Sequence, residues 1–149
     1  MSDYLIPLPW RHELKFGGSY AKSEFDIQGG LFDVDSEQWE TSLDYIIPLP
    51  RFTRGRFGMM SDLSLGYTYK HTADSTAFSG VQIYDNTYEV SQFNVSTSLR
   101  TTDPWGGFAF ASDLVGSPGG MYDHNSDDRL SASRANTDAA YWYAYLSLT

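Results

Sequence analysis

The sequence has no cysteine and no long apolar run. The absence of Cys from all 149 residues excludes a disulfide-bonded scaffold and a Cys-ligated zinc site. No window approaches the roughly 18 consecutive apolar residues that a transmembrane helix needs, which excludes a helical membrane protein. A transmembrane β-barrel is not excluded, because its strands alternate apolar and polar residues. Such strands keep the mean hydropathy low, and here it is -0.39.

Positive charge is also scarce. The chain has 10 Lys and Arg against 19 Asp and Glu, a net charge of -9. No basic stripe could follow a phosphate backbone, so we expect no nucleic-acid partner. The first ten residues, MSDYLIPLPW, contain neither a basic n-region nor an apolar h-region, so they are not expected to be a signal peptide.

Aromatic residues are abundant, at 16% of the chain, and many of them alternate with polar residues. Five segments show this period of two, which is typical of β-strands with one apolar face: 10–20, 39–49, 61–71, 92–100 and 108–114. A sixth segment, 140–149, has Tyr at odd positions and Trp or Leu at even ones, so its faces stay unassigned. No segment shows a 3.6-residue period with capping residues. We therefore predict an all-β fold, an antiparallel up-and-down meander of about six strands with essentially no helix.

The predicted connections alternate between long and short. Long ones are expected at 22–38, 72–87 and 116–138, and short turns at 50–56 and 102–106. Aromatic residues lie near both rims: Trp10, Phe52, Phe57 and Trp105 near the short turns, and Tyr20, Phe25, Trp39, Tyr69 and Tyr88 near the long loops. Long loops at one rim, short turns at the other and two aromatic girdles are typical of bacterial outer-membrane barrels. A soluble β-sandwich does not require its long loops to share one end.

Six strands are too few for such a barrel, because the smallest single-chain barrels close with eight. An open edge in lipid would leave backbone N–H and C=O groups unpaired. We therefore expect residues 1–149 to be a partial outer-membrane β-barrel domain, part of a larger barrel, without a signal peptide or a periplasmic recruitment module.

No motif in the sequence predicts catalysis. The three histidines, at 12, 71 and 124, fall on separate elements without metal-ligand spacing. The segment from Asp123 begins like a calcium loop, but Asp128 stands where Gly is needed and Arg134 where a bidentate Glu belongs. A polar external loop is the preferred interpretation, and weak cation binding stays open. With no nucleophile elbow and no phosphate-binding loop, we expect no enzyme activity, no metal and no cofactor.

Charged residues gather on the polar parity of the predicted strands, the face that would point into a barrel. The candidate lumen-facing residues are Glu13, Lys15, Glu40, Asp44, Asp62, Lys70, Arg100 and Asp113. They could line an aqueous lumen, or they could pair with one another across neighbouring strands, and the two interpretations are compatible.

Several short motifs, in order and across nearly the whole chain, resemble those of a known family. They are Tyr45-Ile-Ile-Pro-Leu-Pro50, Leu65-Gly-Tyr-Thr-Tyr-Lys70 with Phe78-Ser-Gly80, Gln92-Phe-Asn-Val-Ser96, Asp103-Pro-Trp-Gly-Gly107, Ser117-Pro-Gly-Gly120 with Asn125-Ser-Asp127, and Ala139-Ala-Tyr-Trp-Tyr-Ala-Tyr-Leu146. From about Trp10 onward the sequence resembles the barrel domain of the haemolysin secretion/activation family, the outer-membrane transporters of two-partner secretion.

The resemblance implies a 16-stranded barrel that threads a secreted passenger protein outward through its pore. Family members also carry periplasmic recruitment modules, a plug helix and a Val-Arg-Gly-Tyr loop folded into the lumen, and the sequence contains none of these motifs. The expected localisation is the bacterial outer membrane, with outer-membrane lipid as the surrounding partner. Two other functions remain open, a passive porin or adhesin-type barrel and a soluble β-sandwich binding module.

Overall fold

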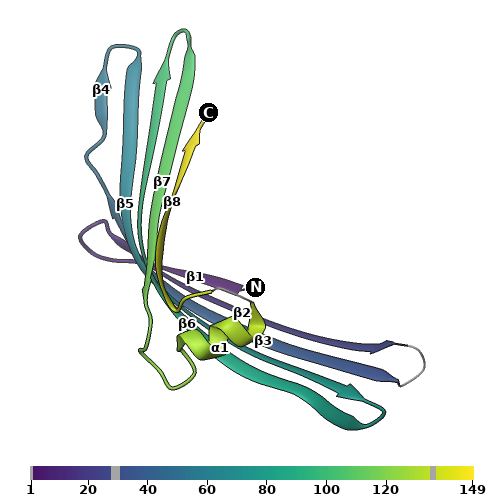
Figure 1. The fold of residues 1–149 in the computed structure, drawn as a ribbon. Coiled ribbons are helices and arrows are strands. Elements are labelled where there is room, and N and C mark those ends of the chain that lie inside the picture. The colour runs from purple at the N-terminus through teal and green to yellow at the C-terminus, as the bar shows by residue number, and fades with distance from the viewer. Residues whose placement is uncertain (1, 28–30, 135–136) are drawn as a thin grey trace.

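A computed structural model describes residues 2–27, 31–134 and 137–149 of the chain (Figure 1). Within them lie eight strands and one short helix. In chain order these are β1 Ser2–Pro7, β2 Glu13–Ile27, β3 Phe32–Pro48, β4 Phe52–Arg54, β5 Phe57–Phe78, β6 Val81–Asp103, β7 Gly106–Pro118, α1 Asp127–Ser133 and β8 Ala140–Leu148. The predicted all-β fold is confirmed. The predicted number of about six strands was too low, because the short strands β1 and β4 were missed.

All the strands belong to one up-and-down sheet. Its order is β1-β2-β3-β5-β6-β7-β8, and every neighbouring pair is antiparallel. β4 also pairs with β5, beyond the end of β3. The sheet is a single bent layer, with the short turns at the end of one arm and the far ends of β2, β3, β5 and β6 in the other (Figure 1). It is not closed: among the described strands, none lies beside the outer edge of β1 or of β8.

The register places the apolar residues of neighbouring strands, which occupy every second position, on one face of the sheet. Successive partners across the sheet are Phe16, Leu43, Tyr67, Phe93, Gly116 and Trp142. Because side chains alternate along a strand, a slip of one residue anywhere would put an apolar side chain among the polar ones. Five strands with the same alternation therefore favour this one alignment.

Two of the three predicted long loops are strand instead. β2 and β3 continue through most of 22–38, apart from 28–30, which lie outside the described residues. β5 and β6 continue through 72–87 to a two-residue turn at Ser79 and Gly80, whose φ angles of 49° and 77° are typical of a type I′ turn. In 22–38 the apolar residues, among them Phe25, Phe32 and Val34, lie at the opposite parity to the neighbouring apolar runs, and 72–87 is rich in Ser, Thr and Asp. The hydrogen-bonded pairing with neighbouring strands makes them extended all the same.

The third long connection is present and contains the helix α1, which contradicts the prediction of essentially no helix. α1 has seven residues, shorter than the window over which a helical period can be recognised. Two acidic residues in its first turn, Asp127 and Asp128, interact favourably with the positive end of the helix dipole. In the described part of the chain, no helix is long and apolar enough to cross a membrane.

The sheet has almost no hydrophobic core. The buried hydrophobic side chains among the described residues are Leu130 on α1 and Ala139 just before β8. A single layer has no second layer to exclude water from either face. The large apolar side chains of the strands therefore remain exposed.

Candidate functional site

All eight candidate lumen-facing residues lie on one face of the sheet. Glu13 and Lys15 come from β2, Glu40 and Asp44 from β3, Asp62 and Lys70 from β5, Arg100 from β6, and Asp113 from β7. The pairs Lys15–Asp44 and Glu40–Lys70 are direct cross-strand neighbours in the register. We call this surface the polar face.

The structure brings most of these residues into contacts across strands. The Lys70 ammonium lies 3.3 Å from the Glu40 carboxylate, and the Lys15 ammonium lies 3.0 Å from Asp3 on β1. The Ser98 hydroxyl donates to Asp62 at 3.1 Å, and the Ser96 hydroxyl donates to Asp113. Glu13 and Arg100 lie near the short turns, away from these pairs. With the contact of Asp44 described next, six of the eight make polar contacts across strands.

A glycine allows the polar side chains to meet across β5. Asn94 on β6 donates to the Asp44 carboxylate on β3 at 3.5 Å, although β5 lies between these strands. Gly66 of β5 occupies the intervening position, where a Cβ atom would collide with the side chains of both Asp44 and Asn94. Gly66 and Asn94 were not among the site residues predicted from the sequence. A glycine within a strand pattern is the signal that could have identified such a close approach.

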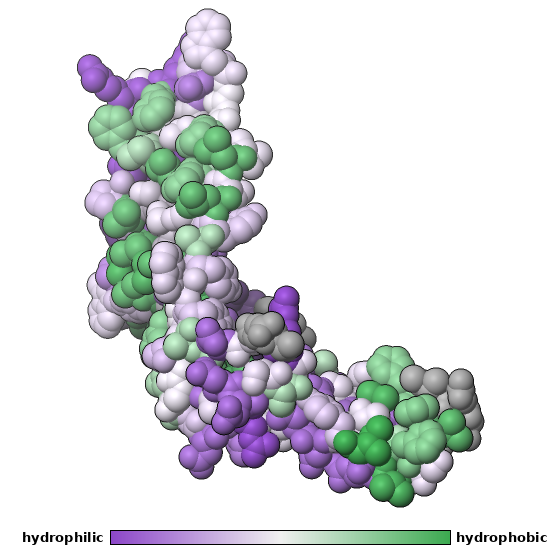
Figure 2. All heavy atoms as spheres, viewed as in Figure 1, coloured by the Kyte–Doolittle hydropathy of each residue, from purple (hydrophilic) through white to green (hydrophobic). Residues whose placement is uncertain are grey.

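The opposite face, which we call the apolar face, is exposed along the whole width of the sheet. Leu65 is 45% exposed, Phe93 48% and Trp142 77%. Figure 2 shows apolar side chains over the arm that ends in the short turns, with hydrophilic residues around α1. At the far end of the other arm, Phe32 and Phe78 pair on the parity of the polar face, so this pair does not continue the apolar face. Scattered exposed apolar residues are ordinary on soluble proteins, but a continuous face of them marks a surface that another medium or molecule covers.

The register also assigns the faces of β8, which the sequence left open. Trp142, Leu146 and Leu148 share the apolar face with Phe110, because Phe110 pairs with Leu148. The odd residues Tyr141, Tyr143 and Tyr145 lie on the polar face. There the Tyr141 hydroxyl accepts a hydrogen bond from Gln92 at 2.6 Å.

One predicted aromatic girdle forms, with fewer members than expected. Tyr20 pairs with Trp39, and the Trp39 ring lies 5.0 Å from Tyr69 between ring centroids, all on the apolar face. Phe25 and Tyr88 were assigned to this girdle wrongly. Their register partners, Val34 and Thr72, show that both side chains lie on the parity of the polar face. Both strands also continue past the girdle instead of ending in loops there.

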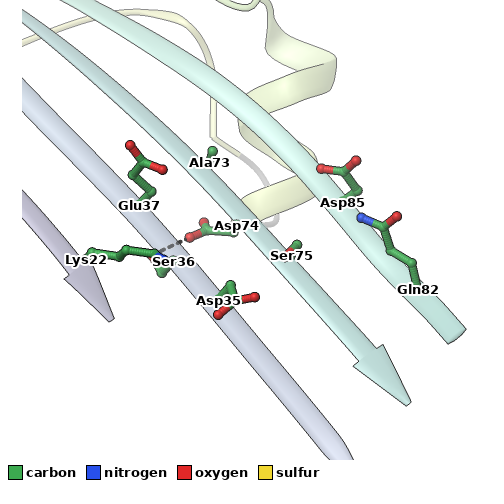
Figure 3. A pocket seen from close by; sticks show the side chains of 9 residues that line it. All are labelled: Lys22, Asp35, Ser36, Glu37, Ala73, Asp74, Ser75, Gln82 and Asp85. Atoms are coloured by element: carbon green, nitrogen blue, oxygen red, sulfur yellow. Dashed lines mark hydrogen bonds between the residues drawn. The ribbon is translucent and has the colours of Figure 1, made fainter. Parts of the chain in front are cut away.

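Beyond the girdle, the face that continues the apolar face becomes acidic. Figure 3 shows Asp35, Glu37 and Asp85 around a shallow hollow of about 380 Å³, with Lys22 at its side. The ion pair between Lys22 and Glu24 raises the pKa of the lysine and lowers the pKa of the glutamate. Both side chains are exposed, so the pair contributes little to stability. Among the described residues, no group of His, Asp and Glu is arranged to hold a metal ion.

The connection between β7 and β8 wraps around the part of β6 that β7 does not reach. Tyr122 packs on Tyr69 of the apolar-face parity, with ring centroids 5.3 Å apart. The His124 carbonyl accepts the Glu89 N–H at 3.1 Å, which pairs a group on the strand edge. Asn86, of the polar-face parity, donates to the Arg129 carbonyl on α1 at 3.0 Å. This segment covers the free edge of β6, as protected edges in β-proteins commonly require.

No family model, curated protein or solved structure matches this chain. The two contrasting faces of the sheet are therefore the basis on which we assign a function.

Proposed function

We propose that this sheet is a portion of the wall of an outer-membrane β-barrel transporter that exports a secreted partner protein. The apolar face contacts lipid and the polar face lines the lumen. The observation that carries the proposal is the exposure of the apolar face in a chain whose described residues bury only two hydrophobic side chains. Lipid can cover such a face without any second protein layer.

The exposed area is too large for a compact soluble monomer. A folded monomer of 16.8 kDa is expected to expose about 7,600 Å². The accessible surface here is 10349 Å², roughly a third more. The soluble β-sandwich alternative needs two sheets that pack face to face, whereas the described strands form one.

The height of the apolar face suits a bilayer. On β5 it runs from Met59, near the short turns, to Tyr69 at the girdle. At about 3.4 Å per residue and a strand tilt of about 40°, this stretch rises roughly 26 Å along the membrane normal. The lipid-facing band of outer-membrane barrels is about 25 Å tall.

The two ends of the sheet suit the two sides of that membrane. The turn between β6 and β7 is short, with Asp103 accepting hydrogen bonds from the backbone N–H groups of Trp105 and Gly106. The arm beyond the girdle is long and carries acidic residues, among them Asp35, Glu37 and Asp85. Short periplasmic turns and long external segments are the rule for these barrels, so the acidic arm is external.

The transport step in this proposal needs no catalytic group. A lumen wall of hydrated, paired charges gives a polypeptide a polar path, and folding of the partner outside would drive its exit. The export of a protein rests on the resemblance to two-partner secretion transporters. A passive porin would have a polar lumen face as well.

The lipid contact can be tested with single-tryptophan variants of the whole barrel that contains the chain in this proposal, folded into phosphatidylcholine vesicles. Each variant retains either Trp142 on the apolar face or Trp105 in the short turn, and every other tryptophan is replaced by Phe. Lipids brominated on their acyl chains should quench the fluorescence of Trp142 strongly and that of Trp105 weakly. Equal weak quenching of the two would contradict the assignment of the apolar face to lipid.

Export is tested in the bacterium that encodes the chain, by deleting residues 32–118. The transporter function predicts that at least one protein disappears from the culture medium while the uptake of small solutes is unchanged. Loss of solute uptake with an unchanged set of secreted proteins would favour the porin instead.

A further inference from the structure

Basic residues gather at the rim that carries the short turns. Four of the ten Lys and Arg residues lie in the connections there: Arg11 after β1, Arg51 after β3, and Arg54 and Arg56 around the turn between β4 and β5. The chain as a whole has a net charge of -9, so this gathering of positive charge runs against its composition. Basic residues beside a membrane attract the phosphate groups of its lipids.

Two of these arginines line a single hollow of about 800 Å³. The hollow lies between the connection from β1 to β2, which contributes Arg11, and the connection that follows β3, which contributes Leu49 and Arg51. Glu13 lines it as well. In the described part of the chain, neither guanidinium forms an ion pair with a carboxylate. A hollow of this volume is large enough for a small polar ligand, and two cations that line it have no partner within the chain.

Hydrogen bonds and the backbone hold one wall of the hollow in place. The Trp10 indole donates to the Tyr45 hydroxyl at 3.1 Å, and that hydroxyl lies 2.5 Å from Nδ1 of His12. Arg11, between these two rings in the chain, has a φ angle of 70°, a left-handed conformation that is uncommon for a residue other than glycine. Uncommon backbone conformations concentrate at ligand sites, where the surrounding structure maintains them. The connection therefore holds the Arg11 backbone in one place beside the hollow.

The hollow lies where the apolar face ends. Tyr45 is on the apolar face, opposite Leu65 of β5. Nearer the rim, Trp10 and Leu49 are exposed, and both line the hollow. Tryptophan is enriched at the boundary between lipid and water. Under the proposed function, on which this inference rests, the hollow is therefore at the depth of the lipid headgroups on the side of the short turns.

The charges of the hollow define the headgroup that fits it. Arg11 and Arg51 supply two guanidiniums, which bind phosphate oxygens through paired N–H groups. Glu13 supplies a carboxylate, which repels a purely anionic headgroup and attracts an ammonium group. A headgroup with both a phosphodiester and a primary ammonium matches all three side chains. We propose that the hollow binds the headgroup of phosphatidylethanolamine, with the phosphate at Arg11 and Arg51 and the ammonium at Glu13.

The experiment titrates the whole barrel that contains the chain, in nonionic detergent micelles, with dihexanoyl phosphatidylethanolamine. The barrel retains Trp10 as its single tryptophan, because Trp10 lines the hollow and its fluorescence reports on a ligand there. We expect a saturable change in fluorescence. Dihexanoyl phosphatidylcholine should bind about tenfold more weakly, because its trimethylammonium group has no N–H to donate to Glu13.

Two double variants separate this site from the general charge of the rim. Arg11→Gln with Arg51→Gln removes both phosphate ligands and should weaken binding roughly 30-fold, about fivefold for each charge. Arg54→Gln with Arg56→Gln removes the same charge from a neighbouring turn, outside the residues that line the hollow, and should weaken binding far less. Circular dichroism of each variant checks that the barrel is folded. Equal weakening by the two double variants would overturn the proposal, as would the absence of a saturable change.

Glu13→Gln tests the ammonium contact separately. It should weaken the binding of phosphatidylethanolamine and strengthen that of phosphatidylglycerol with the same chains, whereas a purely structural role of Glu13 would change both alike. An unchanged preference between the two lipids would overturn the assignment of the headgroup. O-phosphoethanolamine, the free headgroup, should compete only at far higher concentration than the lipid. Competition at the same concentration would mean that the ligand is a soluble phosphate compound and not a lipid.

The quenching of Trp142 by brominated lipid distinguishes a failure of this inference from a failure of the proposed function. It is measured in the Trp142 variant of the same barrel. If that quenching is present and no headgroup binds at the hollow, the headgroup site fails while the lipid-facing wall stands. If the quenching is absent, the proposed function itself fails.

Discussion

Replacing Leu65 by arginine is the most direct test of which face meets lipid. Leu65 lies on the apolar face of β5, 45% exposed, between Tyr45 on β3 and Val95 on β6. It is four residues from Tyr69 at the girdle, which corresponds to a depth of roughly 10 Å at a tilt of about 40°. Leu65 is therefore near the centre of the apolar band.

At that depth, an arginine on the lipid face should reduce the free energy of unfolding by about 2–4 kcal/mol. In water the same change at an exposed position would cost within about 0.5 kcal/mol, so the two environments are well separated. The assay is guanidinium unfolding of the whole barrel to which the proposed function assigns the chain, in phosphatidylcholine vesicles, followed by tryptophan fluorescence. Met59→Arg, at the rim of the same face, should cost only about 0–1 kcal/mol.

The matched control is Ser64→Arg, one residue away and on the polar face, where it pairs with Ser96. In the proposed function Ser64 faces the lumen, where an added charge stays in water, so its cost should be well below that of Leu65→Arg. Similar small costs for both variants would refute the lipid contact. A larger cost at Ser64 would show that the two faces are inverted.

Three further predictions concern the polar face and the turns, each measured by guanidinium unfolding in the same vesicles. Gly66→Ala should destabilise the protein by about 1–3 kcal/mol, because the new Cβ collides with the side chains of Asp44 and Asn94. Gly58→Ala has open space around the new Cβ and should leave the stability unchanged, so equal effects of the two substitutions would contradict the close approach. Asp103→Ala removes the acceptor of two backbone N–H groups in the short turn and should cost about 1–2 kcal/mol, while an unchanged stability would mean that water replaces it. Glu40→Gln breaks a half-exposed ion pair and should cost less than about 1 kcal/mol, a loss that shrinks in 1 M salt; a loss independent of salt would argue against a charge interaction.

The alternation of residues was enough to predict the fold class and to place all eight charged candidates on one face. Period two determines which side chains share a face regardless of where a strand ends. Strand ends were predicted poorly, because they were inferred from the loss of apolar alternation. Beyond the girdle Ser, Thr and Asp occupy either parity of β5, so the apolar alternation stops although β5 and β6 both continue.

A contact between two strands that are not neighbours cannot be predicted from the residue pattern of one segment. Asp44 and Asn94 are 50 positions apart, and their proximity depends on the registers of β3, β5 and β6 together. The faces of β8 were undecidable for a related reason. Tyrosine suits lipid interfaces and polar surfaces alike, so Tyr141 and Tyr143 do not indicate a side until the pairing with β7 is known.

The missed strand β1 did have a signal in the sequence. Leu5-Ile-Pro-Leu-Pro9 is echoed by Ile46-Ile-Pro-Leu-Pro50, and the second copy ends β3, a strand that the alternation had identified. In the structure Pro7 ends β1 and Pro48 ends β3, on either side of β2 and at the same rim. A proline lacks the N–H that would continue the ladder, so each motif stops a strand near this rim, with Pro7 level with Ile46, two residues before Pro48. Taken as a strand terminus, the first copy implies β1, the strand at one edge of the sheet.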